Sequence, residues 1–90
     1  MGNESTKAKL EKAKELHASG LKFRDEKNWE QAISAFLNAA KIRENCLPET
    51  HIDLEQTYFW LAYCYFDYRD YRQAIAYFQK VLQIEERLRD

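Results

Sequence analysis

The chain of 90 residues contains one pattern twice, and this repeat restricts its fold more than any other feature. Residues 23–36 and 65–78 carry the same order of aromatic, small and polar side chains, 42 positions apart. The matched pairs are Phe23 and Tyr65, Asp25 and Asp67, Trp29 and Tyr71, Gln31 and Gln73, Ala32 and Ala74, Ile33 and Ile75, Phe36 and Phe78, and Ile42 and Ile84. A period of this length is typical of stacked units, each of which needs a neighbour to bury its apolar face. The sequence therefore predicts a short solenoid whose function lies on a surface.

Composition narrows the classes of function. The 14 basic and 15 acidic residues leave a net charge of -1, without the basic excess typical of nucleic-acid binding. Ninety residues form one domain, residues 1–90, which is large enough for a modest core but not for an enclosed active site and a substrate domain. We therefore expect no enzyme and no cofactor. No apolar run is long enough to span a bilayer, and the N-terminus is too polar for a signal peptide. Two cysteines without a CxxC pair indicate a reducing compartment, which predicts a cytoplasmic protein.

Apolar residues at three- and four-residue steps predict two helices in the first unit. The first helix is expected to begin at Ser5 or Thr6, either of which can cap it, and to end at about Glu26. Asn28 is expected to cap the second, which runs to about Asn45. The two helices form the first predicted hairpin.

A second hairpin is predicted after Pro48, because proline lacks an N–H group and disfavours helix at the preceding residue. Thr50 and Asp53 resemble a capping box that opens a third helix, which ends at about Tyr68. Asp70 is expected to cap a fourth helix that runs to the end of the chain. The apolar residues of that helix are Ala74, Ile75, Phe78, Val81, Leu82 and Ile84. The predicted fold class is all-α, with two stacked antiparallel helix hairpins.

The repeat resembles the tetratricopeptide repeat, which is written W-x2-L-G-x2-Y, A-x3-F and P over 34 residues. The matching segments are Leu16-x2-Ser19-Gly20-x2-Phe23 with Ala32-x3-Phe36, and Tyr58-x2-Leu61-Ala62-x2-Tyr65 with Ala74-x3-Phe78. The resemblance covers residues 13–46 and 55–88, nearly the whole chain. It implies a helical superhelix that binds a protein or peptide partner and has no enzymatic activity.

Two departures from the family pattern stand out. Glu44 and Glu86 occupy the position of the closing proline, and the period is longer than 34 residues. This arrangement is similar to the 42-residue repeats of kinesin light chains and of some bacterial peptide-responsive regulators. Lys27 and Arg69 replace the usual turn glycine, which leaves the detailed turn geometry open.

The resemblance also implies that the first helix of each unit lines a concave groove. The matching positions are Lys14, His17, Leu21, Arg24 and Asp25 in the first unit, and Gln56, Phe59, Tyr63, Phe66 and Asp67 in the second. One wall is then basic and the other aromatic. If Lys14, His17 and Arg24 share this cleft with Tyr63, the partner is expected to combine acidic and apolar side chains.

The third predicted helix carries two apolar stripes, and a helix that is apolar all round is expected to be buried all round. Tyr58, Leu61, Ala62 and Tyr65 form the stripe expected in the core, and Phe59, Trp60, Tyr63 and Phe66 form the other. One hypothesis is that the second stripe binds a partner peptide or helix. The alternative is that it packs on a further repeat, on a capping helix or on a second copy of the chain. Under that alternative, the apolar surface left open is predicted to comprise Tyr63, Phe66, Tyr77 and Val81.

Two further kinds of site are a metal centre and a lipidation site. His17, His51, Cys46 and Cys64 lie in different segments without ligand spacing, so we predict no metal site. Gly2, followed by a threonine at position 6, fits the N-myristoylation pattern. A lipid on Gly2 would make the protein a weakly anchored membrane adaptor, and this is the only membrane association that the sequence suggests.

Overall fold

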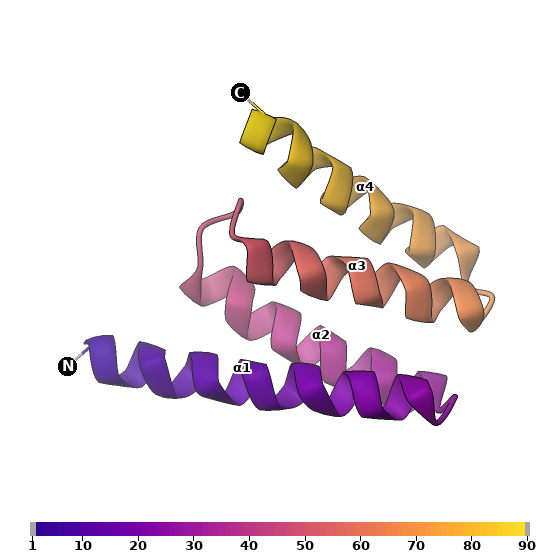
Figure 1. Ribbon diagram of the computed structural model, residues 1–90, viewed down its shortest axis with the longest axis horizontal. Coiled ribbons are helices and arrows are strands. Elements are labelled where there is room, and N and C mark those ends of the chain that lie inside the picture. The colour runs from indigo at the N-terminus through magenta and orange to yellow at the C-terminus, as the bar shows by residue number, and fades with distance from the viewer. Residues whose placement is uncertain (1, 90) are drawn as a thin grey trace.

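The computed structural model describes residues 2–89, and the side chains of residues 5–89. It contains four helices, α1 Gly2–Asp25, α2 Trp29–Cys46, α3 Ile52–Asp67 and α4 Tyr71–Arg89, and no strand within the described range. The helices lie in chain order, with α1 at one edge of the molecule and α4 at the other (Figure 1). Helices α1 and α2 pack as one hairpin, α3 and α4 as a second, and α3 joins them by packing on α2. The prediction of an all-α fold with two stacked hairpins is confirmed.

Two of the predicted helix caps are present. The side chain of Asn28 accepts a hydrogen bond from the backbone N–H of Gln31 at 3.4 Å. The side chain of Asp70 accepts one from the backbone N–H of Gln73 at 3.3 Å. Each cap satisfies an N–H group that has no partner within its own helix. The starts of α2 and α4 therefore follow directly from the sequence.

The predicted starts of α1 and α3 were wrong. Helix α1 begins at Gly2, ahead of Ser5 and Thr6, because no helix-breaking residue separates Gly2 from the first apolar positions. Helix α3 is capped by His51, whose Nδ1 accepts the backbone N–H of Asp53 at 3.0 Å. The backbone N–H of His51 donates to the carbonyl of Pro48 at 3.0 Å, so this turn ends at His51 and the helix starts one residue later than a Thr50 cap requires.

Both hairpins close with the same turn. Lys27 and Arg69 have φ values of 61° and 70°, in the left-handed region that favours glycine. In the residue that follows each of them, the N–H of Asn28 donates to the carbonyl of Phe23 at 2.8 Å, and the N–H of Asp70 donates to the carbonyl of Tyr65 at 2.9 Å. Two non-glycine residues thus hold a conformation that disfavours a side chain.

We expect Arg69→Gly to raise the free energy of unfolding by about 0.5–1 kcal/mol. Relief of the left-handed conformation, about 1–2 kcal/mol, is partly offset by the greater freedom of glycine in the unfolded chain. The measurement is urea unfolding followed by circular dichroism. Arg72→Gly is the matched control, because it places glycine in the ordinary first turn of α4 and is expected to destabilise. If both variants lose stability equally, the turn does not have this conformation.

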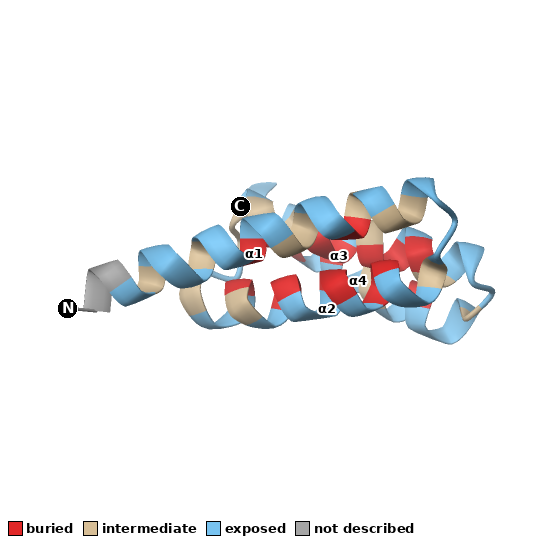
Figure 2. Cartoon of the chain, turned by 90° about the horizontal axis from the view of Figure 1, so that it is seen from below, coloured by how far each residue is buried: buried red, intermediate tan, exposed pale blue. Residues whose placement is uncertain are grey.

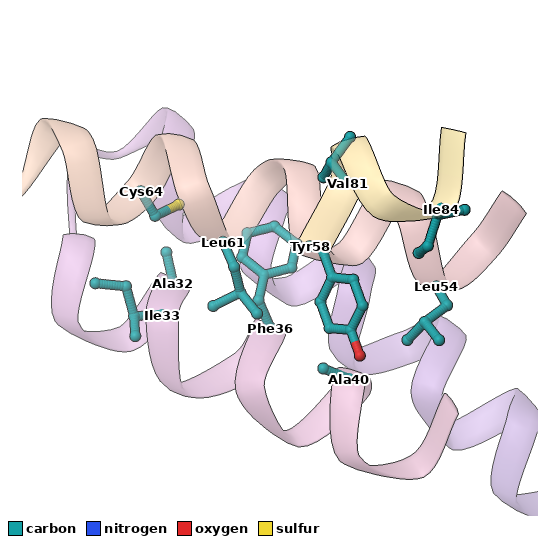
Figure 3. Close-up of a cluster of buried hydrophobic side chains, with 10 residues drawn as sticks. All are labelled: Ala32, Ile33, Phe36, Ala40, Leu54, Tyr58, Leu61, Cys64, Val81 and Ile84. Atoms are coloured by element: carbon teal, nitrogen blue, oxygen red, sulfur yellow. The ribbon is translucent and has the colours of Figure 1, made fainter. Parts of the chain in front are cut away.

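The core lies between the hairpins, and buried positions line the inner sides of the helices (Figure 2). A cluster of buried residues draws on α2, α3 and α4 (Figure 3) and contains Ala32, Ile33, Phe36, Ala40, Leu54, Tyr58, Leu61, Cys64, Val81 and Ile84. Phe36 is fully buried, and a Cβ built on Gly20 would lie 2.7 Å from its ring. Glycine at position 20 therefore lets α1 approach α2 closely over the Phe36 ring.

The prediction that Tyr77 and Val81 lie on the open face was wrong. Val81 is buried, and Tyr77 is half-buried with its ring stacked 5.8 Å from the ring of Tyr65. Helical spacing puts both residues on one stripe with Ala74 and Ile84, and this stripe faces α3. Ile75 and Leu82 belong to an adjacent stripe of α4 and are exposed. Within residues 2–89, no helix combines the length and apolar character needed to cross a membrane.

Candidate functional site

Helix α3 presents three large aromatic side chains to solvent. Phe59, Tyr63 and Phe66 are 38%, 42% and 51% exposed, on the side of the helix opposite the buried residues Leu61 and Cys64. The rings of Phe59 and Tyr63 pack edge to face, with centroids 4.8 Å apart. Three residues of the predicted second stripe therefore form an accessible row of rings, whereas the fourth, Trp60, is half-buried and packs against the core cluster.

The aromatic row continues onto α4. The ring of Tyr63 lies 5.3 Å from that of Phe78, and the ring of Phe66 lies 5.5 Å from that of Tyr71. Successive residues on this side of α4 are three or four positions apart, so they share one helix face. We call this combined surface the outer face; it comprises Phe59, Tyr63, Phe66, Tyr71, Ile75, Phe78 and Leu82. Sequence reasoning missed its α4 half, although the spacing of two interleaved stripes could have indicated it.

The predicted basic wall on α1 lies largely against the neighbouring helices. The guanidinium carbon of Arg24 is 4.4 Å from the centre of the Trp60 ring, a cation–π contact between α1 and α3. Leu21 packs against the core cluster, and His17 contacts α2 and α3. Lys14 and Gln56 are exposed, as is Asp25, which pairs with Arg24 at 2.9 Å. Partner binding at these positions stays a prediction.

A polar junction, formed by His17, Arg43 and Thr57, joins three helices. Arg43 is only 7% exposed and donates to Oγ1 of Thr57 at 2.6 Å and to the backbone oxygen of Asp53 at 3.2 Å. It also donates to Nδ1 of His17 at 3.2 Å, so this nitrogen acts as an acceptor. Sequence reasoning missed Arg43 and Thr57 as junction residues. Position 43 lies seven residues after Phe36, on the buried side of α2, and this spacing was the available signal.

The junction changes the acidity of the histidine. Burial lowers the pKa of His17 from its ordinary value of 6.5, and the charge of Arg43 lowers it further. The charge of Asp53 acts in the opposite direction and is the smallest of the three influences. The neutral ring can accept from Arg43, whereas a protonated ring would point a second donor at the guanidinium. The folded state therefore favours the uncharged form of His17.

The comparisons with known proteins agree with this architecture. A family model described as tetratricopeptide repeat matches residues 16–87. The chain belongs to the tetratricopeptide repeat family. A search of curated proteins found no significant match, and the similarity to kinesin light chain repeats stays a prediction. Tetratricopeptide repeats are in general modules of protein–protein interaction, so this is the broad class of function for the chain.

In this tetratricopeptide repeat protein, the motif residues build the scaffold. Gly20, Ala32 and Phe36 of the first repeat are buried, as are Ala62 and Ala74 of the second. Their small or flat side chains set the approach of paired helices, so they are not available to a partner.

The pKa of His17 predicts that the repeat loses stability in mild acid. Because this pKa is lowered in the folded state, the unfolded chain binds the proton more tightly. The contribution of His17 to the free energy of unfolding is fully present above its pKa in the unfolded chain, about 6.5, and is lost as the pH falls through its pKa in the folded state. Urea unfolding between about pH 7.5 and 5.5 measures this slope. His17→Gln should flatten the slope, and an unchanged slope in this variant would contradict this account.

The remaining predictions concern the lipidation site, a metal site and the two cysteines. Gly2, the predicted lipidation site, lies among residues 1–4, whose side chains are outside the described set. Among the side chains that are described, no group of three or more His, Cys, Asp or Glu is placed to hold a metal. Burial raises the pKa of Cys64 to about 11, so its thiol stays protonated and it acts as a small core residue. Cys46 is half-buried and free.

Proposed function

We propose that the outer face binds a segment of a partner protein. The observation that carries this proposal is the correspondence between the two repeats. Shifting the first repeat by 42 positions places His17, Leu21 and Arg24 of α1 on Phe59, Tyr63 and Phe66 of α3. The same shift places Ile33, Phe36 and Ala40 of α2 on Ile75, Phe78 and Leu82 of α4. The outer face is thus the second-repeat counterpart of one continuous surface of the first repeat.

That first-repeat surface is covered by α3. Ile33, Phe36 and Ala40 are buried and share one core cluster with residues of α3. Arg24 lies under Trp60, and His17 contacts Thr57. On the second repeat the counterparts Phe59, Phe66, Ile75 and Leu82 are exposed, and Phe78 is half-buried. An exposed apolar surface of this kind usually marks an interaction site, and aromatic side chains are enriched at such sites.

Self-association is a second candidate function. Among the side chains of residues 5–89, ten large apolar ones are exposed, and only Leu37 of these belongs to the first repeat. A second copy could therefore cover the outer face of the first, which would make the chain an assembly unit. Sedimentation velocity from micromolar to millimolar concentration separates the two candidates, because a monomer throughout this range excludes the assembly unit. The free cysteines, Cys46 and Cys64, support a cytoplasmic location for either function.

The proposed function is tested by comparing partners captured by the native chain and by the Phe59→Ala, Tyr63→Ala double variant. For a purified partner we expect an affinity loss of at least about tenfold, because central aromatic residues carry much of the binding energy. Leu37→Ala removes an exposed apolar side chain from α2 and is the matched control, which should bind normally. Both proteins should keep the native circular dichroism spectrum. Undiminished binding by the double variant would contradict the proposal.

A further inference from the structure

We propose that the segment bound on the outer face is an amphipathic α-helix that carries a basic side chain in its second turn, opposite Glu55 and Glu85. This inference rests on the proposed function and specifies the chemistry of the partner. It follows from the packing of α3 on the first repeat and from the replacement of Arg43 by Glu85 at the equivalent position of the second repeat.

The helical form follows from the occupant of the first-repeat surface. One helix, α3, covers that surface, with Thr57 near the polar junction and Trp60 over Arg24. Its buried residues recur at helical spacing and meet the side chains of α2 in the shared cluster (Figure 3). In the first repeat this surface lies on α1 and α2, and in the second repeat the equivalent positions lie on α3 and α4, in the same order along the chain. The side chains of the outer face are therefore spaced to receive one helix, oriented as α3 is on the first repeat.

The charge follows from the counterparts of the polar junction. The 42-residue shift places the buried cation Arg43 on Glu85, and it places Ala13 on Glu55. Glu55 lies one turn before Phe59 on α3, and Glu85 lies one turn after Leu82 on the antiparallel α4, so both acids lie at the same end of the outer face. The raised pKa of Glu55, caused by burial and by the Glu85 carboxylate, agrees with this placement. Among the described side chains, neither acid forms an ion pair. The second repeat thus presents negative charge where the first presents a guanidinium.

The basic residue belongs where α3 places Thr57. On the first repeat, Oγ1 of Thr57 accepts a hydrogen bond from Arg43 at 2.6 Å. The covering helix α3 therefore supplies the acceptor, and the first repeat supplies the donor. On the second repeat the acids at the corresponding position require a donor from the occupant. A lysine or arginine supplies that donor and relieves the repulsion between two adjacent carboxylates. An acidic side chain there would add a third negative charge.

A partner fits this surface better than a second copy of the chain. The exposed side of α1 carries no large apolar side chain among residues 5–25, so it offers no apolar stripe to the outer face. The outer face of another copy presents two adjacent helices, whereas the first-repeat surface receives one. The partner is therefore inferred to contribute a single helix with an apolar stripe.

The probe is a synthetic peptide of residues 49–70 with Phe59→Gln, Tyr63→Gln and Phe66→Gln, so that only the stripe used by α3 stays apolar. One peptide carries Thr57→Lys, and its twin carries Thr57→Glu. Each is titrated into the ¹⁵N-labelled native chain, and amide shifts and affinity are measured. We expect shifts on α3 and α4, and binding of the lysine peptide about fivefold tighter than that of its twin. A Glu55→Gln, Glu85→Gln protein should reduce this preference, and Ile75→Asp should abolish binding of both peptides.

Each other result overturns a defined part of the inference. Equal affinities for the two peptides, with shifts on the outer face, would reject charge recognition. An absence of binding at millimolar peptide, or shifts confined to the outward side of α1 and α2, would reject the helix. Self-association through the outer face of the native chain would replace the partner by a second copy. The proposed function fails by a different result, which is retention of captured partners by the Phe59→Ala, Tyr63→Ala variant.

Discussion

Replacing Phe36 with alanine is expected to lower the free energy of unfolding by about 3–5 kcal/mol, because the substitution removes a fully buried ring from the centre of the core. The ring contacts Gly20 of α1 and packs edge to face with His17, whose ring centroid is 5.2 Å away. Urea unfolding measures the loss. Leu37→Ala is the matched control, since Leu37 follows directly on α2 but is 36% exposed, and it should cost about 1 kcal/mol or less.

The contact between Gly20 and Phe36 allows a stricter test. In the native chain a Cβ at position 20 would lie 2.7 Å from the Phe36 ring, so Gly20→Ala should destabilise despite the helix preference of alanine. In the Phe36→Ala background that space is vacant, and Gly20→Ala should stabilise. A reversal of sign in the double-mutant cycle would establish the contact. Additive effects would show that α1 does not approach α2 over Phe36.

Arg43→Ala is expected to lower the free energy of unfolding by about 2–4 kcal/mol, because it removes a buried side chain and leaves His17 without its donor. Arg43→Met should cost less, since methionine retains most of the apolar contacts made by the arginine stem. Lys41→Ala, an exposed position on α2, is the control and should be nearly neutral. Equal stability of the Lys41 and Arg43 alanine variants would show that the polar junction contributes nothing.

The hairpins could be predicted because their signals are local. The period of 42 residues, the caps Asn28 and Asp70, and Pro48 after the second helix together define the boundaries of the units. The cap of α3 could not be predicted in the same way. Histidine caps a helix only when its Nδ1 is turned toward the backbone, as in His51, and that orientation depends on the preceding turn at Pro48.

The exact orientation of α4 could not be predicted because its apolar face is broad enough to hold two adjacent stripes. Tyr77 and Val81 lie on one stripe, and Ile75 and Leu82 lie on the other, so helical spacing alone does not select the side that faces α3. The structure selects the first stripe, because Tyr77 stacks on Tyr65 and Val81 joins the core cluster. The second stripe then extends the aromatic row of α3 into the outer face.

The polar junction depends on contacts between residues distant in sequence. His17 and Arg43 are 26 positions apart, and Thr57 lies 40 positions from His17. A local pattern describes His17 as a polar residue on one side of α1, which is compatible with a groove wall. Only the packing of α3 over the first repeat shows that His17 and Arg24 contact neighbouring helices and that their second-repeat counterparts stay accessible.

The most direct test of the outer face is an NMR titration of the ¹⁵N-labelled chain with a partner isolated by the capture experiment. The account predicts that the largest amide shifts lie around Phe59, Tyr63 and Phe66 of α3 and around Ile75 and Leu82 of α4. Shifts concentrated on the outward side of α1 and α2, with those five residues unchanged, would contradict it.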